Sequence, residues 1–175
     1  STSIGDGVYK STDGGENWTF LGLADSERIA GIEVDPTDPN VAYVAAMGHL
    51  WNANQERGLY KTIDGGKTWQ RILFVDENTG CATVAIDHTN PKTVFATTWQ
   101  YRRSAWAFES GGPGSAFYKS TDGGATWVKL TGDPKRGLPA GELGRIAVAI
   151  APSDSKVVYA TIEAKQGGLF RSKDG

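Results

Sequence analysis

Acidic side chains held between small residues, in a string that repeats, are the first feature of this chain that could do chemistry. Asp13, Asp64 and Asp122 are each followed by two glycines and, five residues after the aspartate, by a tryptophan. A carboxylate in such a loop could serve as a general acid or as a calcium ligand. The loops lack the glutamate that closes an EF-hand, and identical placement in every copy is typical of a structural repeat. We therefore expect neither a metal site nor a catalytic role at these aspartates.

The repeated string is predicted to form a tight turn that its own side chains stabilise. The aspartate accepts hydrogen bonds from backbone N–H groups of the same turn, and a hydroxyl or amide adds a second local bond. The glycines adopt positive φ angles at little steric cost, and the tryptophan covers the turn with a large flat surface. The residues given this structural role are Ser11, Asp13, Gly15, Asn17, Trp18, Thr62, Asp64, Gly66, Thr68, Trp69, Ser120, Asp122, Gly124, Thr126, Trp127, Ser172 and Asp174.

A second group of residues with chemical potential combines aromatic and polar side chains. Three of the six tryptophans, Trp51, Trp99 and Trp106, lie outside the repeated strings. Aromatic planes beside arginine, asparagine and carboxylate groups stack on sugar rings or hold a peptide. The alternative, that the aromatics only pack their segments onto neighbouring structure, stays open. The predicted ligand-binding residues are His49, Trp51, Asn52, Glu56, Arg57, Trp99, Tyr101, Arg102, Arg103, Trp106, Phe108 and Glu109.

The spacing of the strings indicates the elements that carry them. Counted between the aspartates, the copies lie 51, 58 and 52 residues apart, a period typical of propellers and solenoids. Each string joins two short apolar stretches and so forms the turn of a hairpin. A second hairpin lies between successive strings, and its clearest copy joins residues 145–150 to 157–162. Four antiparallel strands per period, labelled A to D in chain order, predict a propeller blade with the string in its C–D turn.

The predicted fold class is all-β, a β-propeller segment of about three blades of four antiparallel strands. The predicted units are residues 1–23 (strands C and D), 24–74 and 75–131 (a blade each) and 132–175 (strands A to C). Closed propellers have about 4 to 8 blades, so these units do not close a ring alone. We expect a segment excised from a larger protein, with the remaining blades as partners. A ring of further copies of the chain is the alternative.

Loop lengths indicate which end of the blades would carry a ligand. The segment from an A–B turn to the next string spans 23 to 35 residues, and that from a string to the next A–B turn 22 to 29. This variation falls in the B–C and D–A connections, which share one end of an up-and-down blade, opposite the strings. Variable loops on a constant scaffold commonly carry binding surfaces. The predicted ligand-binding residues all lie in B–C connections.

Composition excludes several classes of partner. The net charge is −2, and lysines and arginines are scattered, so no footprint for nucleic acid is present. No apolar run reaches the roughly 18 residues of a membrane span. Cys81 is the one cysteine and is expected to be a small buried hydrophobe. We predict no cofactor. The first six residues also lack the charged start and apolar core of a signal peptide.

The repeated string resembles the Asp-box, or BNR repeat, Ser-x-Asp-x-Gly-x-Thr-Trp. Asn17 stands where threonine is usual and Thr62 where serine is usual. Asp-box propellers occur in sialidases, xyloglucan-hydrolysing glycosidases, sortilin-type receptors and a photosystem II assembly factor. The surroundings, Gly48-His49-Leu50-Trp51 and Trp99-Gln100-Tyr101-Arg102-Arg103, look most like large exported bacterial proteins of the sortilin-like or glycosyl-hydrolase-like kind. The resemblance implies an extracellular or periplasmic location.

The sequence favours a non-catalytic propeller segment that binds an exported peptide or carbohydrate. A sialidase is not supported, because no Phe/Tyr-Arg-Ile-Pro motif is present. One alternative is part of a glycoside hydrolase acting on polysaccharide, which needs a pair of carboxylates. Candidates on the predicted ligand end are Glu56, Glu109, Glu142 and Glu163, with no pairing readable from the sequence. The other alternative is a structural segment that only completes the ring.

Overall fold

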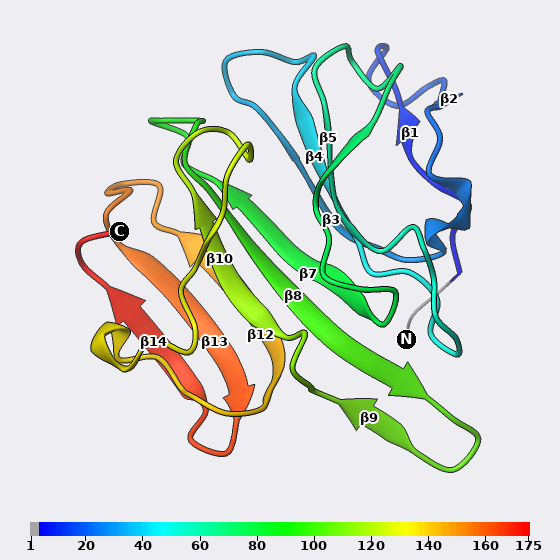
Figure 1. Cartoon of the computed structure of the whole chain (residues 1–175). Helices are drawn as coiled ribbons and strands as arrows, with labels where there is room; N and C mark the ends of the chain where they lie inside the picture. Colours follow the sequence, from blue (N-terminus) through cyan, green and yellow to red (C-terminus); the bar gives the residue numbers. More distant parts are fainter. Residues whose placement is uncertain (1–3) are drawn as a thin grey trace.

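The computed structural model describes residues 4–175 as four antiparallel β-sheets that follow one another in chain order (Figure 1). The predicted all-β propeller fold is confirmed. Residues 1–3, with which the first predicted unit begins, lie outside the described residues. The exact divisions between units along the connecting segments remain a prediction. No helix in the described part of the chain has the length and apolar character that crossing a bilayer requires.

The two central sheets have four strands in the order expected of a blade. Their orders are β3-β4-β5-β6 and β7-β8-β10-β11, with β9 paired to β8 beyond this path; the outer sheets are β1-β2 and β12-β13-β14. The elements are β1 (Tyr9–Lys10), β2 (Thr19–Phe20), η1 (Ala24–Ser26), β3 (Ile29–Val34), β4 (Ala42–Ala46), β5 (Gly58–Thr62), β6 (Gln70–Leu73), β7 (Thr79–Ile86), β8 (Val94–Arg103), β9 (Phe108–Ser110), β10 (Ala116–Ser120), β11 (Val128–Lys129), η2 (Pro134–Arg136), β12 (Leu143–Ile150), β13 (Val158–Ala164) and β14 (Gly168–Ser172).

Alternation along strand β4 shows how the sheets pack on each other. Val44 lies in an apolar cluster with Val8 of the first sheet, whereas Tyr43 contributes to a cluster with Val84 and Val94 of the third. Successive side chains of a strand point to opposite faces, so a strand between two sheets is apolar at every position. This burial on both faces explains why β4 is a continuous apolar run.

The first strands of the sheets, β3, β7 and β12, line a concavity of about 450 Å³. Small residues face it, among them Gly31, Ala85 and Ala149, as expected where blades converge. Glu33 lies among them, and burial raises the pKa of its carboxyl.

One connection differs from its predicted form. Strand β8 continues to Arg103 and pairs with the additional strand β9, which the predicted four-stranded blade does not contain. The hairpin projects from one end of the sheet (Figure 1). Trp99, Tyr101 and Arg103 alternate with Gln100 and Arg102, the period of a strand, and this pattern could have revealed the extension.

The Asp-box turns are closed by their own polar side chains. In the second copy, Asp64 Oδ1 accepts hydrogen bonds from Thr62 Oγ1 at 2.7 Å and from the Thr68 backbone N–H at 3.0 Å. Asp64 Oδ2 accepts a bond from Thr68 Oγ1 at 2.6 Å. The bonds from Thr68 and Thr62 stabilise the charged carboxylate, so they hold the pKa of Asp64 well below its usual range. The turns of Asp13 and Asp122 repeat these bonds.

The box tryptophans do more than cover their own turns. Trp69 Nε1 donates a hydrogen bond to Leu21 O at 2.7 Å, and Trp127 Nε1 donates one to Ile72 O at 3.0 Å. Each bond joins a box to the last strand region of the preceding sheet. Trp18, in the first copy, instead donates to Gly15 O of its own turn and is 61% exposed.

Lysines and glycines add to this contact between sheets. Lys61 Nζ donates a hydrogen bond to Gly123 O at 2.8 Å, and Lys119 Nζ donates one to Gly175 O at 3.0 Å, each in the next box along the chain. Gly66 has a φ of +94°, and a Cβ added there would collide with the Leu21 side chain. The second box glycine is therefore needed for backbone conformation and for close approach of the sheets.

We predict that Trp127→Phe lowers the free energy of unfolding by about 1–3 kcal/mol, because Ile72 O loses its donor while the ring is largely kept. Urea denaturation followed by circular dichroism measures the change. Trp18→Phe is the matched control, with an expected change below about 0.5 kcal/mol because this side chain is exposed. Equal losses in the two variants would show that the bond between sheets is not stabilising.

Candidate functional site

Two kinds of connection meet at each end of the sheets. Box turns contact the A–B turns, as in the backbone bond from Gly65 N to Asn40 O at 2.9 Å. At the other end, B–C connections contact D–A connections, as in the bond from Asn54 N to Glu77 O at 2.9 Å. The predicted ligand-binding residues lie at this second end, on residues 49–57 and on the extended β8–β9 hairpin. We call it the loop end.

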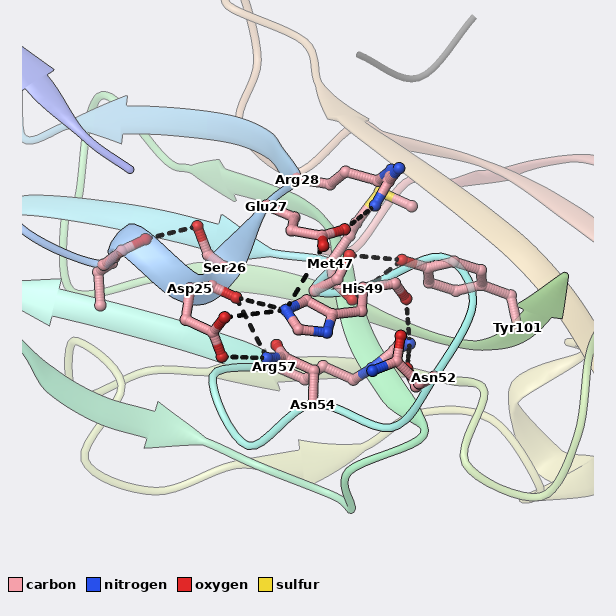
Figure 2. A network of polar contacts seen from close by, with 12 residues as sticks. Asp25, Ser26, Glu27, Arg28, Met47, His49, Asn52, Asn54, Arg57 and Tyr101 are labelled. Carbon is pink, nitrogen blue, oxygen red and sulfur yellow. Dashed lines mark hydrogen bonds and ion pairs between the residues drawn. The ribbon is translucent and has the colours of Figure 1, made fainter. Parts of the chain in front are cut away.

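His49 is the centre of a polar cluster at the loop end (Figure 2). Its Nε2 lies 3.1 Å from both Asp25 O and Asp25 Oδ1, and 3.7 Å from Glu27 Oε1. Asn54 Nδ2 also donates a hydrogen bond to Asp25 Oδ2, at 2.9 Å. The short helix η1 presents Asp25, and Glu27 follows it with a φ of +48°. Asp25, Glu27 and Asn54 were not predicted, although the two acidic residues lie in a D–A connection at the predicted end.

Glu56 borders this cluster and has unusual surroundings for a carboxylate. Its Oε2 is buried and has no hydrogen-bond partner among the residues that the structure describes. Burial, and then the negative charge of Asp25, raise the pKa of the Glu56 carboxyl. A raised carboxyl pKa is the direction of shift that favours a general acid.

Arg57 anchors the B–C connection from inside. The side chain is fully buried, and its Nη2 donates hydrogen bonds to His49 O at 2.5 Å and to Asn52 O at 3.4 Å. Its guanidinium carbon lies 4.6 Å from the centre of the Tyr101 ring, and burial lowers the pKa of the guanidinium. Gly48, with a φ of +79°, permits this packing because a Cβ there would collide with Arg57. Arg57 therefore holds the connection in place.

Aromatic side chains of the β8–β9 hairpin pack beside this connection. Trp99 and Tyr101 are stacked with ring centres 4.6 Å apart, and Phe108 meets Trp99 edge-on at 5.8 Å. Tyr101 Oη donates to Met47 O and lies equally near Gly48 O, at 3.1 Å from each. A pocket of about 200 Å³, here named the aromatic pocket, is lined by Arg28, Met47, Leu50, Trp99, Tyr101, Arg103 and Phe108.

Most of the remaining predicted residues are on the surface of the loop end, and Arg102 is half-buried there. Trp51 is 55% exposed and Trp106 is 89% exposed. Arg102, at the end of β8, contacts two other connections. Its Nη1 donates a hydrogen bond to Trp51 O, between β4 and β5, at 3.4 Å, and its Nη2 bonds to Asn78 Oδ1, between β6 and β7. Asn52, Arg103 and Glu109 are exposed as well. Glu109 lies opposite Arg102 in the register of strands β8 and β9.

The predicted ligand-binding residues therefore differ in burial. Arg57, Trp99 and Tyr101 are buried, which fits the packing role that the sequence left open. Trp51 and Trp106 have free aromatic faces and remain candidates for ligand contact. His49, Glu56 and Arg102 lie between these groups and are partly buried, whereas Phe108 is 42% exposed although its ring packs against Trp99.

Comparison with known proteins places the chain among propellers of two related kinds. A family model named Sortilin-Vps10 and described as sortilin, neurotensin receptor 3, matches residues 6–138. The xyloglucanase of Hypocrea jecorina is 31% identical over 160 residues, and xyloglucanase Xgh74A of Acetivibrio thermocellus is 28% identical over 158. Each alignment covers 75% of this chain and 17% of the relative, so the chain spans less than a fifth of these proteins.

A solved structure gives the same fold. The GH74 xyloglucanase from Xanthomonas campestris superposes with a TM-score of 0.70 at 19% identity, over 99% of this chain and 26% of that one. At this identity the likeness concerns the fold alone.

We predict that Tyr101→Phe loosens the loop end, because Met47 O and Gly48 O lose the phenolic group that lies 3.1 Å from both. Amide hydrogen exchange should become about tenfold faster over residues 47–57, the effect of losing about 1.4 kcal/mol of local stability. Trp106→Phe is the control, since that side chain is almost fully exposed. Unchanged exchange in Tyr101→Phe would mean that the other contacts, Arg57 among them, hold the connection without the phenolic group.

Proposed function

This chain belongs to the Sortilin-Vps10 family, and from that premise we propose that it forms sugar-binding blades of a larger exported glycoside hydrolase that acts on xyloglucan-type polysaccharide. The relatives that support the enzymatic part of this proposal are xyloglucanases from a bacterium and a fungus. The remaining blades of the ring are the partners that the proposal requires.

The observation that carries the proposal is the pair of exposed indoles at the loop end, Trp51 and Trp106. They belong to different connections, which are joined by Arg102 and by the backbone bond from Arg103 N to Leu50 O at 3.0 Å. The indoles are therefore mounted on one ordered surface. Two flat aromatic faces on such a surface suit successive rings of a sugar chain, with polar neighbours to hold the hydroxyls.

Glu56 is the carboxylate that best suits general-acid catalysis within this chain. Among the four carboxylates predicted for the loop end, Glu163 is already engaged, since its Oε2 accepts bonds from Ser110 Oγ and Arg145 N, both at 2.8 Å. Glu56 combines a raised pKa with a buried oxygen that has no hydrogen-bond partner among residues 4–175. Asp25, whose side chain is 66% exposed, is the neighbouring carboxylate that the two-carboxylate mechanism of glycosidases needs.

A second candidate function is binding without catalysis, of a carbohydrate or a peptide. It is favoured by the family model, whose description is that of a receptor rather than an enzyme. Under this function the indoles bind the ligand in the same way, but Glu56 has no role in turnover. An assay of hydrolysis therefore distinguishes the two candidate functions, whereas an assay of binding does not.

We predict that Trp51→Ala and Trp106→Ala each weaken binding of a xyloglucan heptasaccharide to the full-length polypeptide by about 3- to 10-fold, because each removes one stacking surface. Isothermal titration calorimetry measures the affinities. Trp18→Ala is a matched control, because Trp18 is also exposed but lies at the box end. Unchanged affinity in both loop-end variants would refute the choice of surface.

We predict that Glu56→Gln reduces xyloglucan hydrolysis by the full-length polypeptide at least about 100-fold while leaving binding intact, since the amide cannot donate the catalytic proton. Because the pKa of Glu56 is raised and the acid acts protonated, wild-type activity should fall as pH rises through that pKa. Residual activity of the variant should lose this dependence. Glu16→Gln is the control, because Glu16 is exposed at the box end. Full activity of Glu56→Gln would leave binding without catalysis as the function of this segment.

A further inference from the structure

Three arginines from separate sheets gather around the aromatic pocket. Arg28 lines the pocket just before strand β3, and Arg103 lines it from the end of β8. Arg145 of β12 does not line the pocket itself, but its guanidinium carbon lies 5.4 Å from the centre of the ring of Trp99, which does. The guanidinium carbon of Arg103 lies 5.1 Å from the centre of the Phe108 ring. Positive charge is thus held against aromatic walls.

Arg28 is incompletely satisfied although it is buried. The residue is only 6% exposed, and its Nη1 is bonded to Glu27 Oε2. Its Nε has no hydrogen-bond partner within the described part of the chain. A buried N–H group without an acceptor is unfavourable by about 1–3 kcal/mol, so a ligand oxygen near this group would restore a lost interaction.

The charges around this group of arginines do not balance. A second pocket, of about 520 Å³, shares Arg28 and Met47 with the aromatic pocket and is also lined by Arg145. Glu27 is the one acidic residue among the described residues that line either pocket. Within residues 4–175, Arg103 and Arg145 form no ion pair, and Glu163 accepts the backbone N–H of Arg145 rather than its side chain. An anionic ligand would complete the site.

We propose that the aromatic pocket, with Arg28, Arg103 and Arg145 around it, binds the carboxylate of a uronate unit in an acidic polysaccharide. A guanidinium group binds a carboxylate through two parallel hydrogen bonds, and the aromatic walls accept the sugar ring. The volume of about 200 Å³ is below that of typical ligand pockets, so it suits a single unit rather than a long chain.

The segments that line the pocket also carry the two exposed indoles, which favours a sugar over a peptide as its ligand. Leu50 lines the pocket and directly precedes Trp51, and Arg103 lies in the same hairpin as Trp106. In this proposal a polysaccharide bound on the two indoles extends to the arginines. The inference rests on the proposed function, because it assumes that the loop end binds sugar.

Calorimetry on the full-length polypeptide tests this with three probes: tetragalacturonate, its methyl ester, and a neutral xyloglucan heptasaccharide. We expect tetragalacturonate to bind at least about tenfold more tightly than its ester, since only the free acid forms charge-assisted bonds with arginine. Arg145→Gln should remove this preference and leave the neutral probe unaffected. Arg171→Gln is the matched control, because Arg171 lies 5.7 Å from the centre of the Tyr159 ring, on strands away from the pocket.

The outcomes separate this inference from the proposed function. If the heptasaccharide binds but tetragalacturonate and its ester bind equally, the inference is overturned and the proposed function stands. If none of the three sugars binds, both are overturned. Equal effects of Arg145→Gln and Arg171→Gln would overturn the inference alone, as would tighter binding of an unrelated peptide with a free C-terminal carboxylate than of tetragalacturonate.

Discussion

The hydrogen bond from an internal Asp-box tryptophan to the preceding sheet is the contact on which the arrangement of the sheets depends. Trp69 and Trp127 each span from their own box to a carbonyl of the sheet before. Lysines of the earlier sheet also donate hydrogen bonds to the next box along the chain, as Lys61 does to Gly123 O. Because the box is rigidly closed by its aspartate, these bonds fix the distance between neighbouring sheets at one end.

This fastening at one end leaves the opposite end free to vary. The B–C and D–A connections there differ in length, and the structure holds them by other means: the buried guanidinium of Arg57, and Tyr101 Oη near Met47 O and Gly48 O. The buried side-chain atoms that have no hydrogen-bond partner within residues 4–175, Glu56 Oε2 and Arg28 Nε among them, are concentrated at this end. A scaffold with constant boxes and a variable loop end suits a family whose members bind different ligands.

Much of the fold was predictable because the boxes repeat at a nearly constant period. The residue types of each box also determine its hydrogen bonds, which are local in sequence. The partners of Trp69 and Trp127 were not predictable, since they are contacts between residues about 50 positions apart. For the same reason, the sequence grouped buried Trp99 with exposed Trp106, and it missed Asp25 and Glu27, whose closeness to His49 depends on how two connections meet.

At the loop end, exposed indoles, a partly buried glutamate and an arginine-rich aromatic pocket lie on connections that contact one another. Together they describe a surface suited to a polysaccharide, which is the central claim of the proposed function. A crystal structure of the full-length polypeptide with a bound xyloglucan heptasaccharide would test this most directly. The account predicts that sugar rings stack on Trp51 and Trp106, with the chain running toward Glu56. Sugar bound at the box end, or on other blades with the two indoles uncovered, would contradict it.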